Sequence, residues 1–158
     1  MESKNYTLIL FQEIEKETDF ALKKNILFKE INSIIYSIDL QKSNYFENSV
    51  YIIFGIYFRY FSPNTKIPVR HTKCHFEIRY GTLYNELIEK DTNKQLPLII
   101  NELNMVEIKN NIVNKFIPYF IDYFSINNLK TNYPNLHFPD VVLAWIESQD
   151  FIAYLKNN

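Results

Sequence analysis

Two stretches of alternating residues decide the fold, IIYSIDLQ at residues 34–41 and VYIIFGIYFRY at residues 50–60. Large apolar side chains occupy every second position in both stretches: Ile34, Tyr36, Ile38 and Leu40 in the first, and Val50, Ile52, Phe54, Ile56, Phe58 and Tyr60 in the second. A period of two is typical of a β-strand with one buried face. Ser and Asn residues recur between positions 43 and 49, so the two stretches predict an antiparallel hairpin.

Further strands extend this hairpin on both sides. Residues 26–30 predict a short strand, joined to the strand at 34–41 by a tight turn at Asn32-Ser33. Pro63 and Pro68 mark a loop after residue 60. A third alternation then places Cys74, Phe76, Ile78 and Tyr80 opposite His75, Glu77, Arg79 and Gly81. The sequence therefore predicts an antiparallel meander of about four strands.

Helical patterns flank the meander. Residues 6–18 carry apolar side chains at helical spacing and predict an N-terminal helix. A long apolar stripe from Ile108 to Phe124 predicts a second helix, which Pro118 should kink near residues 114–117. A cap at Ser125, a turn at 133–135 and a start at Pro139-Asp140 predict a final helical segment or pair through Trp145 and Tyr154.

These elements predict an α+β fold, with the C-terminal helices packed on the apolar face of the sheet. We find no repeat, low-complexity tract or linker, so residues 1–158 are expected to form a single domain. Hydrophobic residues make up 47% of the chain and charged residues 22%, a composition that excludes a disordered chain. One cysteine excludes a disulfide-stapled module.

Charge and glycine content exclude several classes of function. The net charge of -1 gives no basic footprint for duplex nucleic acid. Gly55 and Gly81 are the two glycines of the chain, too few for a phosphate-binding loop or a dinucleotide fingerprint, and no cofactor is expected. The N-terminus lacks the pattern of a signal peptide, and the apolar block at 50–58 is too short for a membrane span. A cytoplasmic protein without a membrane contact is expected.

The second face of the sheet holds the candidate site. Its polar and aromatic side chains are candidates for contact with a partner: Asp39, Gln41, Tyr51, Tyr57, Arg59, His75, Glu77 and Arg79. Charged groups above a floor of tyrosines would suit a polar ligand or another protein. The alternative is a solvated face whose charges pair across the strands. Gly55 lies in the middle of this face. It either allows another group to approach the sheet closely or marks a bulge.

Catalytic and metal-binding patterns are weak. His71, Cys74 and His75 form an H-x-x-C-H cluster, but adjacent strand residues point to opposite faces, so we expect neither a metal site nor a Cys-His nucleophile. Cys74 is interpreted as a small buried hydrophobic residue. Glu77 and Asp39 form a candidate carboxylate pair for acid-base chemistry. A platform for single-stranded RNA is a further alternative, although the basic residues are scattered.

Three runs of sequence carry a resemblance to a known family. They are FALKKNILFKE at 20–30, IDLQKS at 38–43 and YIIFGIY at 51–57. Between about residues 15 and 85 the chain resembles a bacterial family catalogued as domain of unknown function 4304. The LQKS motif matches fully and Gly55 matches the family glycine, whereas Ile53 stands where an Asn is usual. The resemblance implies an α+β meander and a bacterial origin, and it supplies no activity.

Two functions from different classes remain. The leading hypothesis is a non-enzymatic protein-binding module, for example an immunity- or antitoxin-like protein that neutralises a bacterial toxin through the exposed sheet face or an edge strand. The alternative is a small-molecule-binding or hydrolytic enzyme that uses Glu77, Asp39 and His75 in a pocket between the sheet and the C-terminal helices. Homodimer formation through the same sheet face is a third hypothesis.

Overall fold

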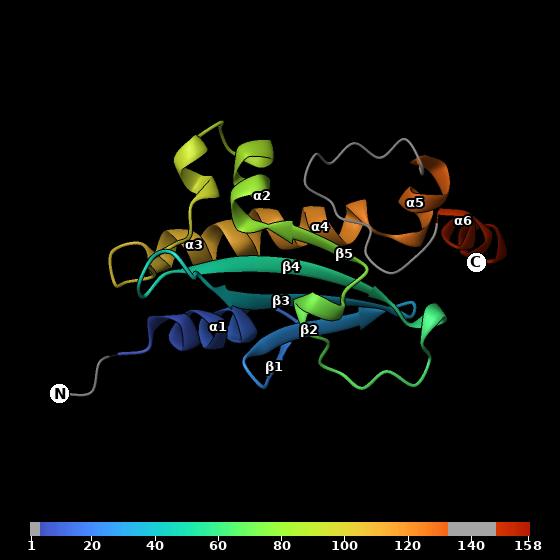
Figure 1. Cartoon of the computed structure of the whole chain (residues 1–158), viewed down its shortest axis with the longest axis horizontal. Helices are drawn as coiled ribbons and strands as arrows, with labels where there is room; N and C mark the ends of the chain where they lie inside the picture. Colours follow the sequence, from blue (N-terminus) through green and yellow to red (C-terminus); the bar gives the residue numbers. More distant parts are fainter. Residues whose placement is uncertain (1–3, 133–147) are drawn as a thin grey trace.

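The computed structural model describes residues 4–132 and 148–158, and it confirms the α+β class. Its centre is a five-stranded antiparallel meander in the order β1-β2-β3-β4-β5 (Figure 1). The strands are β1 (Ala21–Lys23), β2 (Ile26–Ile31), β3 (Ile34–Lys42), β4 (Val50–Phe58) and β5 (Phe76–Arg79). The helices are α1 (Tyr6–Glu17), α2 (Tyr80–Leu87), α3 (Met105–Asn111), α4 (Ile117–Tyr123), α5 (Ile126–Asn132) and α6 (Ser148–Asn157).

The predicted hairpin is the centre of the sheet. β3 and β4 pair without interruption from Ile34 opposite Phe58 to Lys42 opposite Val50. The predicted turn at Asn32-Ser33 is confirmed, and both residues have positive φ, as a two-residue turn of type I′ requires. The short strand β1 was not predicted, because its three residues are too few to show an alternation.

Three predicted strand boundaries are wrong. β4 ends at Phe58, and Arg59 and Tyr60 belong to the 3₁₀ turn η1 (Arg59–Phe61). The last strand begins at Phe76 rather than Cys74 and ends at Arg79, where α2 begins. Tyr80, Leu83 and Tyr84 are all buried in the core, and this helical spacing explains why the chain leaves the sheet there.

The predicted kink lies where Pro118 requires it. A π-helical turn, η4 (Ile112–Phe116), separates α3 from α4, and Pro118 falls in the first turn of α4. Proline has no N–H to donate to the preceding turn, which favours such a local widening. Figure 1 shows α3 and α4 following one another along β4, so the stripe from Ile108 to Phe124 still faces the sheet.

One large core joins the helices to the apolar face of the sheet, as predicted. Phe54 on β4 packs edge-on against Phe120 with ring centroids 5.4 Å apart, and Phe58 packs against Phe151 of α6 at 5.1 Å. The hydroxyl of Tyr36 donates a hydrogen bond to the carbonyl of Phe124 at 3.1 Å. The same core includes Leu10, Phe11 and Ile14 of α1.

The predicted cap of the next helix is confirmed. The Ser125 hydroxyl accepts a hydrogen bond from the Asn128 N–H at 3.2 Å, at the start of α5. The predicted turn at 133–135, the helix start at 139–140 and Trp145 lie outside the described residues. In α6, Phe151 and Tyr154 are buried.

Candidate functional site

A loop of the same chain covers the middle of the second sheet face. The segment between η1 and β5 contains the 3₁₀ turn η2 (His71–Lys73) and crosses β3 and β4. Val69 and Cys74 from this segment form a second small core with Ile35 and Tyr57. The prediction of an exposed face is therefore wrong at the centre of that face, because alternation reports which side chains share a face and not what lies on them.

Gly55 makes this cover possible. A Cβ atom at position 55 would lie 2.6 Å from Cys74 Sγ and 2.9 Å from Ser37 Oγ. The strand register runs through Gly55 on both sides, opposite Ser37 and Glu77, so the residue marks a close approach rather than a bulge. Cys74 was predicted on the apolar side with Phe76 and instead lies on the second face, because η2 precedes it in place of a strand.

The two candidate carboxylates bind different groups of this loop. Asp39 is 2% exposed, and its Oδ2 and Oδ1 accept hydrogen bonds from the N–H groups of His71 at 3.0 Å and Leu40 at 2.8 Å. Arg70 Nη1 lies 3.8 Å from Asp39 Oδ1. Glu77 Oε1 is 2.9 Å from His71 Nδ1, which donates because an ionised carboxylate can only accept. Asp39 and Glu77 thus anchor the loop.

Tyr57 and His75 stack on one another beside the loop. Their ring centroids are 4.4 Å apart, and the Tyr57 hydroxyl lies 2.6 Å from Thr65 Oγ1. His75 Nδ1 accepts a hydrogen bond from the Phe58 N–H at 2.9 Å, so a neutral imidazole carries its proton on Nε2. Burial lowers the pKa of His75 to about 4, which keeps the ring neutral at physiological pH.

Arg59 holds the first half of the loop. Its guanidinium donates to both carboxylate oxygens of Glu30, at 2.7 and 2.9 Å. Its Nη1 also donates to the carbonyls of Pro63 at 3.2 Å and Thr65 at 2.8 Å. The hydrogen-bonded pair with Glu30 raises the pKa of Arg59 and lowers the pKa of Glu30, since each stabilises the charged form of the other. The side chain connects β2 to the loop across η1.

The remaining three candidates form a corner at the start of β4, where Gln41 and Arg79 are exposed and Tyr51 is half-buried. Gln41 pairs with Tyr51 in the strand register, and the Arg79 guanidinium lies over the Tyr51 ring, 4.2 Å from its centroid. Within residues 4–132 and 148–158, no carboxylate lies within ion-pair distance of Arg79. The structure therefore divides the eight candidates into five around the loop and three at this corner.

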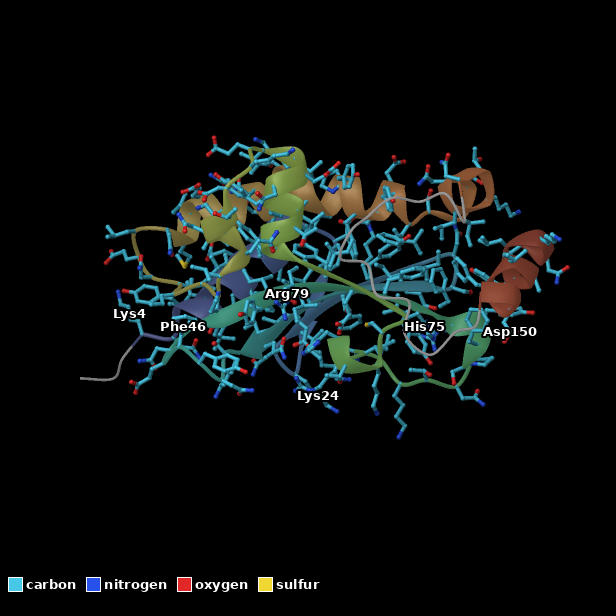
Figure 2. The ribbon with its side chains drawn as sticks, turned by 45° about the horizontal axis from the view of Figure 1, so that its top comes forward. Lys4, Lys24, Phe46, His75, Arg79 and Asp150 are labelled. Atoms are coloured by element: carbon cyan, nitrogen blue, oxygen red, sulfur yellow. The ribbon has the colours of Figure 1, made fainter. Side chains whose placement is uncertain are left out.

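Two features of the surface were missed by the sequence analysis. The first is a cavity of about 820 Å³ between the loop and the β1–β2 turn. Its lining includes the cations Lys24, Lys66, Arg70 and Lys73. Three of these lie within residues 66–73, a weak sequence signal, but only the fold adds Lys24 from a distant hairpin. Figure 2 shows Lys24 on the side of the sheet where η2 lies.

The second feature is a set of exposed apolar side chains on segments at one end of the molecule, here called the apolar end. It consists of Tyr45, Phe46, Leu96, Ile99, Leu103 and Val106. A bridge between Val50 and Leu98 holds the β3–β4 loop beside the segment that leads to α3. Both views place these two segments at the same end of the molecule (Figures 1 and 2). The side chains were not separable from core residues by sequence, because exposure depends on what packs above them.

The described part of the chain offers no group of three or more His, Cys, Asp and Glu side chains that could hold a metal ion. Burial raises the pKa of the Cys74 thiol to about 12, which makes it a poor nucleophile. In the same part of the chain, no helix has the length and apolarity needed to cross a bilayer.

Comparisons with known proteins assign no family to this architecture. No protein-family model, no curated protein and no solved structure matches the chain. The resemblance to domain of unknown function 4304 therefore stays a prediction from the sequence motifs. Any functional conclusion rests on the geometry of the surface.

Proposed function

We propose that the protein is a non-enzymatic protein-binding module of the bacterial cytoplasm, an immunity- or antitoxin-like protein that neutralises a toxin by covering its surface. The observation that carries this proposal is the apolar end. Of the eight large hydrophobic residues exposed in the described part of the chain, six belong to it; the other two are Tyr60 and Ile67. An exposed apolar cluster of this kind marks an interaction surface.

The individual side chains have the character of binding anchors. Tyr45 is 90% exposed, and Leu103 is 93% exposed. Burying a large apolar side chain in a partner stabilises a complex by about 1.5–3 kcal/mol. Aromatic residues lose little conformational entropy on binding and are enriched among the residues that dominate interface energies. Tyr45 and Phe46, at the tip of the β3–β4 loop, are suited to enter an apolar pocket of the partner.

The corner formed by Gln41, Tyr51 and Arg79 adjoins this surface and supplies polarity. Tyr51, Arg79 and Leu96 line one shallow depression, so Leu96 of the apolar end lies beside two residues of the corner. The Arg79 charge, held over Tyr51, is available to a carboxylate of the partner. The partner should therefore present an apolar pocket for the aromatic tip with a carboxylate opposite Arg79.

The hydrolytic alternative has less support. Asp39 and Glu77 would have to act as acid and base, yet each carboxylate is bonded to the loop that covers it. The Nδ1 atom of His75 is bonded to the Phe58 N–H and is not free to accept a proton from a substrate. These contacts are explained by anchoring the loop, without a reaction.

Site-directed photo-crosslinking tests the proposal. A benzophenone amino acid at position 45 of the full chain should give one dominant adduct with a protein of the native host lysate. The same group at position 60 is the matched control, because Tyr60 is also an exposed tyrosine, at 50%, but follows the opposite end of β4. The adduct at position 45 should be lost when Arg79→Glu is added.

The crosslinked protein must then behave as a toxin. Its expression alone should arrest growth, and co-expression of the wild-type chain should restore growth, whereas Phe46→Ser/Leu103→Ser should not. Equal crosslinking from positions 45 and 60 would overturn the proposed surface. An adduct that contains a second copy of this chain, with a dimer in sedimentation, would replace the proposal by homodimer formation.

A further inference from the structure

The cavity between the loop and the β1–β2 turn has the size and lining of a ligand site, and the proposed protein-binding surface does not use it. Its volume of about 820 Å³ falls within the usual range for small-molecule sites. The side chains at its base, including Ile26, Tyr57, Val69 and His75, are buried, whereas the cations around it are exposed. An apolar floor with a polar rim is the arrangement such sites commonly show.

The charge of the rim has one sign. The thirteen lining residues include four cations and no carboxylate. Lys24, Lys66 and Lys73 make no ion pair with any residue that the structure describes, and Arg70 reaches Asp39 only at 3.8 Å. Since the whole chain carries a net charge of -1, this concentration of positive charge is local to the cavity.

The framework around the cavity is fixed by contacts already described. Arg59 and Asp39 hold the two halves of the loop through its carbonyl and N–H groups, and Gly55 lets Cys74 pack on the sheet. Lys24 comes from the two-residue turn between β1 and β2, where its φ is 52°. His75 adds a neutral donor, because its Nδ1 is occupied and Nε2 bonds to no described residue.

We propose that this cavity binds a small organic phosphate with at least two negative charges. The lysines and Arg70 would contact the phosphate oxygens, and the organic body would rest on Tyr57, Val69 and Ile26. Lysine ammonium groups act on phosphate as point charges, and Arg adds directed hydrogen bonds. A free anion such as pyrophosphate satisfies the rim alone, whereas a nucleotide such as ADP also covers the floor.

Calorimetric titration of the full chain with these two probes tests the proposal. Pyrophosphate should bind saturably with a Kd of about 1 mM or lower, and ADP should bind about tenfold more tightly because it also buries apolar surface. Lys66→Gln/Lys73→Gln should weaken both probes by about tenfold or more, since two charge-assisted contacts are lost. The difference in affinity between this variant and the wild type should become smaller as the salt concentration rises.

The control variant is Lys90→Gln/Lys115→Gln, which changes the net charge equally at exposed positions outside the cavity lining. It should bind both probes as the wild type does. Amide chemical shifts on addition of ADP should change at residues 24 and 70–75 and not around residues 90 and 115. Absent binding at 10 mM pyrophosphate and 10 mM ADP, or equal weakening by the two double variants, would overturn the proposal. If pyrophosphate binds as tightly as ADP, the part of the proposal that places the organic body on Tyr57, Val69 and Ile26 is overturned.

Discussion

The Sγ atom of Cys74 packs against Gly55 so closely that a Cβ atom at position 55 would lie only 2.6 Å from it. The loop that covers the second sheet face therefore needs a residue without a side chain at the centre of β4. This one approach converts a polar sheet face into a second small core with a cavity at its border.

Gly55→Ala should destabilise the protein through this contact. The new methyl group would overlap Cys74 Sγ and Ser37 Oγ, and overpacking of this kind costs about 1–3 kcal/mol. Urea unfolding followed by circular dichroism measures the change in the free energy of unfolding. Cys74→Ala in the Gly55→Ala background should recover part of the loss, because it removes the nearer atom. Wild-type stability of the single variant would show that the loop does not rest on β4.

His75 should make stability depend on pH in the acid range. Its pKa is about 4 in the folded state and near 6.5 in the unfolded chain, so the unfolded chain takes up the proton first as the pH falls. This contribution to the free energy of unfolding should be complete above about pH 6.5 and should decrease between about pH 6.5 and 4.

Urea unfolding of wild type and His75→Phe at pH 7.5 and pH 5 isolates this effect. The variant should be less stable at pH 7.5 by about 1–3 kcal/mol, because the buried Phe58 N–H loses its acceptor. Its stability should decrease less than that of the wild type on moving to pH 5. Identical pH dependence of the two proteins would contradict burial of a neutral imidazole.

The Cys74 thiol should be unreactive in the folded protein. It is 1% exposed, and burial raises its pKa to about 12, so the thiolate is scarce at pH 8. Reaction with Ellman's reagent at pH 8 should be slow in buffer and complete within minutes in urea. Gly55→Ala should accelerate the reaction in buffer if it displaces the loop. Fast labelling of the native wild type would indicate an open second face.

Arg59→Ala should affect the loop more than Glu30→Gln does. The exposed ion pair contributes about 0.2–1 kcal/mol, whereas Arg59 also donates to the carbonyls of Pro63 and Thr65. Arg59 lowers the pKa of Glu30 in the folded protein. The ion pair therefore adds its full stability at pH values above the pKa of Glu30 in the unfolded chain, and this stability is lost as the pH falls through the pKa of Glu30 in the folded protein. Limited proteolysis at residues 62–68 should be faster in Arg59→Ala than in Glu30→Gln. Equal proteolysis rates in the two variants would show that Arg59 acts only through its ion pair with Glu30.

The local patterns of the sequence predicted most of the elements. The alternation in β3 and β4 predicted the hairpin, because a strand with one buried face requires period two. The stripe from Ile108 to Phe124 predicted the helices above the sheet, and Pro118 predicted the kink, because its missing N–H is a property of the residue itself. These features depend on neighbours within a few residues.

The sequence selected eight candidate residues, but it did not predict what each of them contacts. All eight residues were selected because alternation places them away from the main core. The structure uses Asp39, Glu77 and Arg59 to hold a loop, and it leaves Gln41, Tyr51 and Arg79 at the corner at the start of β4. No periodicity reports which segment crosses a sheet face, since that contact joins residues more than thirty positions apart, as with Asp39 and His71.

The sequence by itself determined the α+β class, the central hairpin and the helices on its apolar face, because hydrophobic periodicity is a local property that burial must satisfy. The tertiary structure alone decided that Gly55 receives Cys74, that Lys24 joins the cations of residues 66–73, and that the β3–β4 loop lies at the same end of the molecule as the segment that leads to α3. Those relationships arise from loop packing and long-range closure, and no local pattern encodes them.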